Sequence, residues 1–347
     1  MTATATHLIG AHLASVLDDV HIAADLSEAR VGDRSVEVTE PRDLASGLAM
    51  LLYEQIHSGR PEHDGPRPRT LRDGRLEERL AAATPHETTT IVARKVGESP
   101  DGELLVLLVD GVRVAVPASA RLTGDDRERG DEVVVRLAAV RPALSPGFFL
   151  ADGSRGRPSG RPLLRVYVHI EDVAHAPAVW SAILGRLERE GVPYRAKVSS
   201  SPLLYPRHDA LVVYLAPGTW HAAGAVVAAT RGLAGVGTRT SPFTHRLGAG
   251  VGAAWEPADD RPGRAGMSFG EHRALAVAEG LVAHAEAPDG RDRTAAVAEA
   301  LTAANIDPLH PARNIDSPGL DAFPDPDSAE FTGPLDEFPP HSERGGV

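Results

Sequence analysis

The spacing of hydrophobic residues changes along this chain, and these changes most constrain its fold. In residues 1–85, apolar residues recur every three or four positions in HLIGAHLASVLDDVHIAADL, PRDLASGLAMLLYEQIHSG and RDGRLEERLAAAT, a spacing that predicts helices. Residues 88–152 contain runs rich in Val and Leu, separated by Gly, Asp and Pro, which predict a small antiparallel sheet or barrel. We therefore expect a helical N-terminal region over 1–85 and a small antiparallel β subdomain over 86–155.

The rest of the chain mixes both patterns. Strands are predicted at LLRVYVHIED, VPYRAKVSSS and ALVVYLAP, and helices at PAVWSAILGRLEREG, WHAAGAVVAATRGLAG, SFGEHRALAVAEGLVAHAE and DRTAAVAEALTAAN. Residues 156–305 are thus expected to form a mixed α+β domain, so the fold class is α+β. Residues 306–347 hold nine acids against Arg313 and Arg344, and they predict a disordered, acidic, Pro-rich tail.

Composition excludes several classes of function. The net charge of -12 argues against nucleic acid or an anionic membrane surface as the main partner. The chain has no cysteine, which removes disulfides, thiolate metal sites and cysteine nucleophiles. Its N-terminus lacks the pattern of a signal peptide, and no stretch reaches the length of a membrane span. We expect a cytoplasmic protein.

Lysine is rare in this chain. Of the 36 basic residues only Lys95 and Lys197 are lysines. Arginine keeps its proton in proteins, whereas a buried lysine can lose it and act as a base. Lys95 is explained by chance. For Lys197 there are two explanations: chance, or a need for an amine that can lose its proton.

Strand alternation places titratable side chains together. In LRVYVHI, one face carries Arg165, Tyr167 and His169; in VPYRAKVS, one face carries Arg195, Lys197 and Ser199. Between residues 193 and 250 there are six cations and one acid, Asp209. A positive patch on an acidic protein predicts a small, strongly anionic ligand, and phosphate fits the forked donors of arginine.

The motifs of other phosphate chemistries are missing from the sequence. It has no P-loop, no dinucleotide fingerprint and no metal-binding HExxH. β-Elimination of phosphate needs only a base, an acid and cations for the leaving group. Lys197 is the candidate base, and either His169 or Tyr167 is the candidate acid. No cofactor is expected.

Several segments resemble the HopA-like effector family that occurs in actinobacterial peptide-modification clusters. The resemblance covers residues 85–305 and rests on SPGFFLADGSRGRP, RVYVHI, GVPYRAKV, YPRHDALVVYL, PFTHRLGAGVGAAWEP and SFGEHRALAVAEGL. It implies a phosphoserine or phosphothreonine lyase of class V lanthipeptide and thioamitide (RiPP) pathways, which makes dehydroalanine or dehydrobutyrine. It also implies a phosphorylated precursor peptide as substrate, with a separate kinase and cyclase as partners.

A more remote similarity to phosphothreonine lyases implies roles for individual residues. It implies Lys197 as the base, His169 as the acid and Arg207 as a phosphate ligand. Where those lyases carry a lysine near the histidine, this chain has Arg165 and Tyr167. The remaining candidate phosphate ligands are Arg165, Arg195, Arg246 and Arg273, the last two by local context only.

Two alternatives to the lyase interpretation remain open. Lys197 could form a structural ion pair with Asp209, and the whole protein could be a non-catalytic peptide-binding scaffold that serves a kinase or cyclase.

Overall fold

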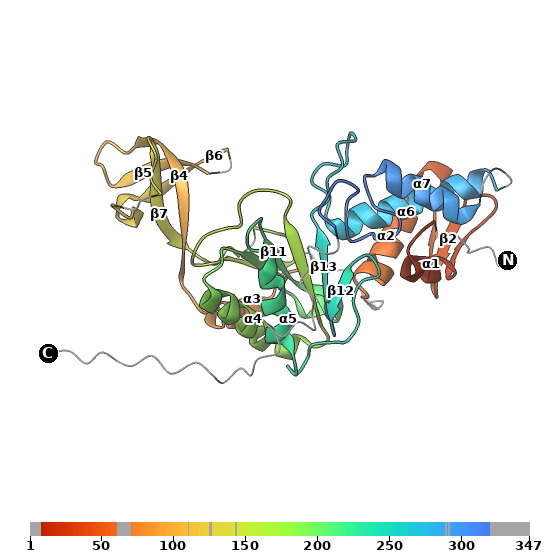
Figure 1. The fold of residues 1–347 in the computed structure, drawn as a ribbon, viewed down its shortest axis with the longest axis horizontal. Coiled ribbons are helices and arrows are strands. Elements are labelled where there is room, and N and C mark those ends of the chain that lie inside the picture. Colours follow the sequence, from red (N-terminus) through yellow and green to blue (C-terminus); the bar gives the residue numbers. More distant parts are fainter. Residues whose placement is uncertain are drawn as a thin grey trace.

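A six-stranded antiparallel sheet forms the centre of the molecule (Figure 1). This computed structural model describes residues 8–60, 71–109, 111–124, 127–142, 144–288, 290 and 292–319. The strand order is β12-β13-β9-β11-β10-β8. The strands are β8 (Phe148–Asp152), β9 (Leu164–Ile170), β10 (Arg195–Ser199), β11 (Arg207–Leu215), β12 (His245–Gly248) and β13 (Val251–Trp255).

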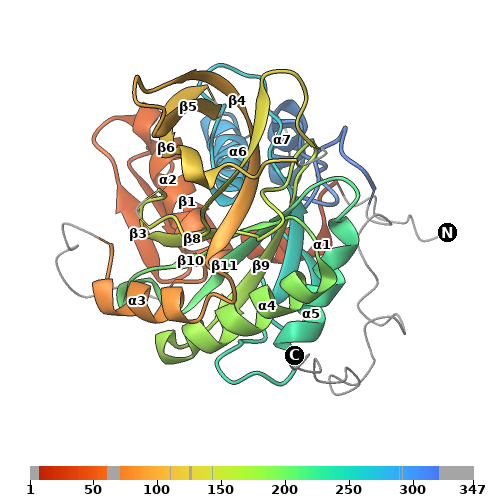
Figure 2. The same ribbon diagram turned by 90° about the vertical axis from the view of Figure 1, so that its left-hand side faces the viewer.

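Three helices lie along one side of this sheet (Figure 2): α3 (Gly74–Ala82), α4 (Ala176–Glu190) and α5 (Ala223–Thr230). In α4, apolar residues at helical spacing are fully buried, including Trp180, Ile183 and Leu187. The helix ends at Gly191, whose φ of 65° suits a residue without a side chain. The even-numbered residues of β9 pack against these helices, so its odd-numbered residues face the other way.

A second core covers part of the opposite face. It joins α1 (Ala11–Leu17), α2 (Leu44–Leu52), α6 (Phe269–Glu286) and α7 (Arg293–Ala303) with Tyr167 and Val212 of the sheet. The helices α2, α6 and α7 lie together, although the sequence separates α2 from the other two by more than 200 residues (Figure 1). The N-terminal region therefore shares one core with the C-terminal helices.

The prediction that residues 1–85 are helical is wrong for residues 20–37. These form a three-stranded antiparallel sheet of β1 (Val20–Ile22), β2 (Glu28–Val31) and β3 (Arg34–Glu37). Alternate burial in β2 and a tight turn at Gly32, with φ of 57°, reveal the hairpin. The first helix is only seven residues long, so the helix predicted from apolar spacing extends too far towards the C-terminus.

A four-stranded sheet projects from the central sheet and has its own small core (Figure 1). Its strand order is β6-β5-β4-β7, with β4 (Thr88–Glu98), β5 (Leu104–Val109), β6 (Val112–Pro117) and β7 (Glu132–Ala138). These strands are antiparallel, in agreement with the sequence pattern. However, β8 lies within the predicted β subdomain and pairs with β10 in the central sheet.

The predicted tail begins too early in the chain. Residues 306–319 fold onto the second core, where Ile306 and Ala312 are buried and the backbone of Ala312 accepts a hydrogen bond from Trp255. Residues 320–347 lie outside the described residues. The mixed α+β fold class is confirmed by this architecture. Within the described residues, no helix combines the length and apolar character needed to cross a membrane.

Candidate functional site

A cleft of about 670 Å³ opens on the face of the central sheet that carries Lys197. The strand register aligns Lys197 with Val212 and Tyr167 in one row, and Tyr214 with Arg165 in the next. Paired residues of antiparallel strands point to the same face, so all five side chains lie on one surface. The first turn of α6 and the end of the α2 segment form the other walls. The lining holds six cations and four carboxylates.

Lys197 lies at the β10 end of this row, and its Nζ is 4.2 Å from the centre of the Phe148 ring. The Tyr214 ring lies 5.9 Å from the same nitrogen. No carboxylate within the described part of the chain lies at ion-pair distance from Lys197. The alternative of a structural ion pair with Asp209 is therefore wrong, because Asp209 pairs with Arg207.

Arg207 enters the cleft in a fixed orientation. Its Nε and Nη2 donate to the two carboxylate oxygens of Asp209 at 2.7 and 2.9 Å, and Nη2 also donates to the Tyr53 hydroxyl at 3.0 Å. Arg207 and Asp209 are both buried. The neighbouring Arg207 cation holds the pKa of Asp209 well below its usual range, although burial acts to raise that pKa.

Arg165 is held in a similar way on the other side of Tyr167. Its Nε donates to Glu256, and its guanidinium lies 5.2 Å from the centre of the Tyr214 ring. Arg165 and Arg207 thus flank the row that contains Lys197 and Tyr167. Each arginine keeps part of its guanidinium for a ligand, since a carboxylate engages only some of its five N–H donors.

The hydroxyl of Tyr167 is buried and has no hydrogen-bond partner among the described residues. Burial raises the pKa of Tyr167 strongly, although the adjacent Arg165 cation opposes this. The hydroxyl therefore keeps its proton at neutral pH. A buried, unpartnered donor costs free energy, and a ligand oxygen in the cleft would remove that cost.

His57 is a cleft residue that the sequence analysis missed. It ends the π-helical turn η2 (Tyr53–His57) that extends α2, a helical irregularity common at functional sites. Its Nε2 lies 3.6 Å from Asp209 and its Nδ1 lies 2.9 Å from the Ser241 hydroxyl. Burial lowers the pKa of His57 to about 4, against the attraction of Asp209.

The close approach of His57 to α6 depends on Gly270. A Cβ at Gly270 would lie 2.1 Å from the His57 ring, so no larger residue fits there without displacing the ring. A glycine in the first turn of a helix was the only signal in the sequence for this contact, because His57 comes from a distant part of the chain.

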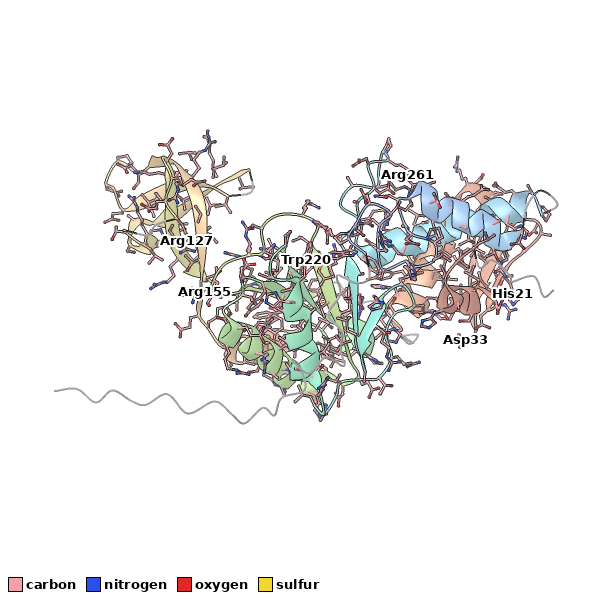
Figure 3. The ribbon with its side chains drawn as sticks, viewed as in Figure 1. His21, Asp33, Arg127, Arg155, Trp220 and Arg261 are labelled. Atoms are coloured by element: carbon pink, nitrogen blue, oxygen red, sulfur yellow. The ribbon has the colours of Figure 1, made fainter. Side chains whose placement is uncertain are left out.

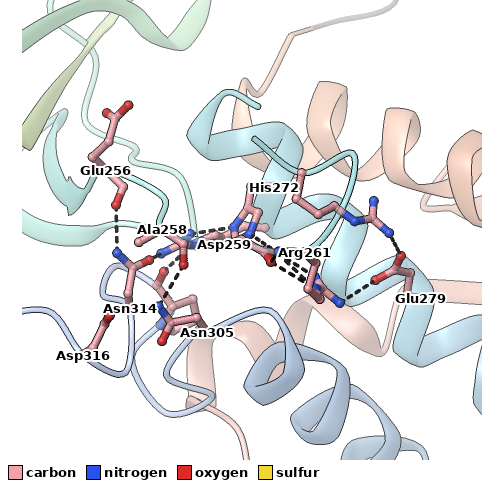
Figure 4. A network of polar contacts seen from close by, with 12 residues as sticks. Glu256, Ala258, Asp259, Arg261, His272, Glu279, Asn305, Asn314 and Asp316 are labelled. Carbon is pink, nitrogen blue, oxygen red and sulfur yellow. Dashed lines mark hydrogen bonds and ion pairs between the residues drawn. The ribbon is translucent and has the colours of Figure 1, made fainter. Parts of the chain in front are cut away.

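Arg273 is not a cleft residue, although it was a predicted phosphate ligand. It is fully buried, and its donors are used by the carbonyl of Pro311 at 3.0 Å, by Asn314 at 2.8 Å and by His272 at 2.8 Å. Asn314 in turn donates to the carbonyl of Glu256 (Figure 4). Arg273 thus supports the wall that carries Glu256, the partner of Arg165.

The same wall is fixed by a second set of polar contacts (Figure 4). Asp259 accepts hydrogen bonds from Arg261, and its Oδ2 lies 2.9 Å from Nε2 of His272. Hydrogen bonds from Arg261 and His272 keep the pKa of Asp259 below its usual range. The segment between β13 and α6, which lines the cleft, is therefore tied to α6.

Three further predicted site residues lie away from the cleft. The His169 ring contacts His208 and its Nδ1 lies 3.2 Å from the carbonyl of Arg239, so it does not line the cleft. Arg246 is exposed on β12, four strands from β10, a separation of roughly 19 Å at normal strand spacing. Arg195 pairs with the buried Asp152 at 2.6 Å and faces a neighbouring groove.

Metal ligation has no evident site in the described parts of the chain. No cluster of three or more His, Asp or Glu side chains suited to a metal ion occurs among these residues.

The fold and the cleft together define an α+β protein with a cation-lined cleft on an antiparallel sheet. Residues 139–313, half of the chain, match the model of the HopA1 effector protein family, and the chain belongs to that family. The match includes Lys197 and most of the cleft, but not Tyr53 or His57.

Two solved structures are similar to the chain. The effector protein from Pseudomonas syringae pv. tomato strain DC3000 is 14% identical, with a TM-score of 0.44 over 80% of this chain and 91% of that chain. The effector from Pseudomonas syringae pv. syringae strain 61 is 15% identical, with a TM-score of 0.45 over 79% and 91%. No curated protein matches the chain in sequence.

Proposed function

We propose that this protein is a carbon–oxygen lyase that eliminates phosphate from phosphoserine or phosphothreonine in a peptide. One observation carries the proposal. Lys197, an amine without a carboxylate partner among the described residues, lines the same cleft as two oriented arginines and an unpartnered tyrosine hydroxyl. These are the parts that a metal-independent elimination requires: a base, an acid and cations.

The phosphate binds between Arg207 and Arg165. Asp209 engages Arg207 through Nε and Nη2, so Nη1 has no protein partner among the described residues and is available to a phosphate oxygen. Asp209 and Glu256 also act as fixed supports that orient the guanidinium groups before the substrate arrives. Such preorganised donors stabilise developing negative charge without a cost of reorganisation during the reaction.

The elimination transfers two protons: one from Cα to the base, and one from the acid to the departing phosphate oxygen. Lys197 acts as the base that removes the Cα proton, and the electron pair of that C–H bond forms the Cα–Cβ double bond. The Cβ–O bond breaks, and Tyr167 donates its proton to the departing phosphate oxygen. Phosphate leaves, the product is dehydroalanine or dehydrobutyrine, and solvent returns Lys197 and Tyr167 to their starting protonation states. Tyr167 replaces His169 as the acid because His169 does not line the cleft.

The substrate class follows from the resemblance of this chain to lyases of peptide-modification pathways. We propose a precursor peptide phosphorylated by a separate kinase as the substrate, and a cyclase that consumes the dehydrated product in lanthipeptide-type biosynthesis. Membership of the HopA1 family is compatible with this assignment.

A synthetic phosphoserine peptide and its phosphothreonine counterpart test the proposal. Each is incubated with the purified protein and a small thiol, and the products are analysed by mass spectrometry. Elimination removes phosphoric acid and leaves an alkene that adds the thiol. Hydrolysis leaves an alcohol that does not react.

Thiol adducts at the phosphorylated position support the lyase. Binding without any change in peptide mass would instead support the scaffold, and an alcohol product would indicate a phosphatase.

A further inference from the structure

A second groove of about 870 Å³ begins at Lys197 and runs towards the projecting β-sheet. It shares Ser145, Arg161, Lys197, Tyr214 and Glu256 with the cleft, so the two hollows are continuous. We propose that this groove binds an acidic, extended segment of the substrate peptide next to the phosphorylated residue. The proposal rests on the proposed function, since it assumes that a peptide occupies the cleft.

Charge is the first argument. Six cations line the groove: Arg127, Arg155, Arg157, Arg161, Arg195, which pairs with the buried Asp152, and Lys197. They face one carboxylate of the lining, Glu256. That carboxylate is engaged by Arg165. On a chain with a net charge of -12, such a concentration of positive charge selects an anionic ligand. The groove is distinctly more cationic than the cleft, which holds four carboxylates.

The position of the arginines is the second argument. Arg127 lies in the connection that precedes β7 of the projecting sheet, and Arg155 follows β8 of the central sheet. Figure 3 shows both side chains at the junction between the two sheets. Both arginines line the groove that begins at Lys197. Both sheets therefore take part in recognition of the ligand.

The edge of β4 supplies the third argument. Residues 88–93 of β4 pair with β7 on one side, whereas pairing with β5 begins only at Arg94. On the open side the Thr90 amide donates to the carbonyl of Ser154. Backbone groups alternate along a strand, so the amide and carbonyl of Val92 point to this same side. Val92 lines the groove and is 42% exposed.

An extended peptide matches these features better than a compact anion. A strand edge offers main-chain hydrogen bonds to an extended chain, while the arginines select acidic side chains. The groove also lies within the size range of sites that enclose a drug-sized ligand. A phosphate bound at Arg207 and Arg165 would leave the flanking residues of the same peptide to occupy this groove.

Binding measurements test the groove separately from catalysis. The probes are fluorescent phosphoserine peptides whose flanking residues, on either side, are Asp, Gln or Lys, and fluorescence polarisation reports their affinity for the Lys197→Ala protein. We expect Asp residues to strengthen binding most, and only when they stand on one particular side of the phosphoserine. Arg155→Glu should weaken binding of that peptide roughly three- to tenfold, and Arg127→Glu with Arg155→Glu should weaken it further, since each reversal replaces an attraction with a repulsion.

The control is Arg113→Glu, which makes the same charge change at an exposed position of β6 outside the groove. Equal weakening by this variant, or equal affinity for all three peptides, would overturn the proposal. Displacement of the peptides by single-stranded RNA at equal charge concentration would also overturn it, in favour of a nucleic-acid groove. Because these readouts need no turnover, they hold or fail independently of the lyase activity.

Discussion

Asp209 accepts two hydrogen bonds from the guanidinium group of Arg207, at 2.7 and 2.9 Å, and both residues are buried. Two buried charges of opposite sign stabilise a fold only while both are present, because either one alone carries an uncompensated desolvation cost. The pair therefore fixes the Arg207 guanidinium group in the lining of the cleft.

Replacing Asp209 tests whether Arg207 binds phosphate. Asp209→Asn should lower the free energy of unfolding by about 3 kcal/mol, because it leaves a buried cation unpaired. Inorganic phosphate should then stabilise the variant more than the wild type, since the anion becomes the counter-ion of Arg207. Urea unfolding with and without phosphate measures both effects. The exposed Asp172→Asn is the control, and equal stabilisation of wild type and variant by phosphate would count against this site.

Removing the Tyr167 hydroxyl should separate stability from activity. Tyr167→Phe deletes a buried hydroxyl without a partner among the described residues, so the protein should keep or slightly gain stability. If Tyr167 is the acid, kcat should fall by at least about 100-fold. Tyr194→Phe gives the opposite pattern, with a loss of about 1 kcal/mol but normal turnover, because that hydroxyl donates to Glu188 at 2.9 Å outside the cleft. Full kcat in Tyr167→Phe would eliminate Tyr167 as the acid.

Three buried histidines should make stability depend on pH. Burial lowers the pKa of His57, His208 and His272 to about 4, against 6.5 in the unfolded chain. The unfolded state then binds more protons between pH 6.5 and 4, so stability falls as pH is lowered through this window. Each histidine accounts for roughly 3 kcal/mol of this loss of stability. Urea midpoints across this range measure how steeply stability depends on pH, and this dependence should become weaker in His57→Asn. Stability that does not change with pH in the wild type would refute the prediction.

Truncation should distinguish the two halves of the predicted tail. Ending the chain after residue 305 removes both backbone and side-chain partners of Arg273 and should prevent stable folding. Ending it after residue 319 should leave both the thermal midpoint and the KM for phosphopeptide unchanged. A lower KM in the chain that ends after residue 319 would instead indicate that residues 320–347 compete for the cationic groove.

Some of this site was predictable from local pattern. Strand alternation places Arg165, Tyr167 and Lys197 on single faces of β9 and β10, and the register puts these faces on the same side of one sheet. The alternation of side chains along a strand cannot reveal the order of the strands in the sheet, however. Arg246 has favourable neighbours in sequence, yet β12 lies at the far edge of the sheet from β8 and four strands from Lys197.

Other features depend on tertiary contacts between distant segments. Arg273 has the sequence context of a surface helix residue, and only the packing of residues 306–319 against α6 buries it. His57 reaches the cleft because α2 packs on α6, a contact across more than 200 residues. Neither hydrophobic spacing nor charge counts contain that information.

Lys197→Arg is the sharpest test of whether Lys197 acts as the base of the elimination. Arginine keeps the positive charge and much of the length of the side chain but cannot lose its proton. Lys95→Arg, at the other lysine of the chain, is the matched control. Phosphate elimination from a phosphopeptide is followed by mass spectrometry for both variants. We predict that Lys197→Arg binds the peptide but loses at least about 1,000-fold in kcat, while Lys95→Arg matches the wild type. Elimination by Lys197→Arg at the wild-type rate would show that Lys197 is not the base.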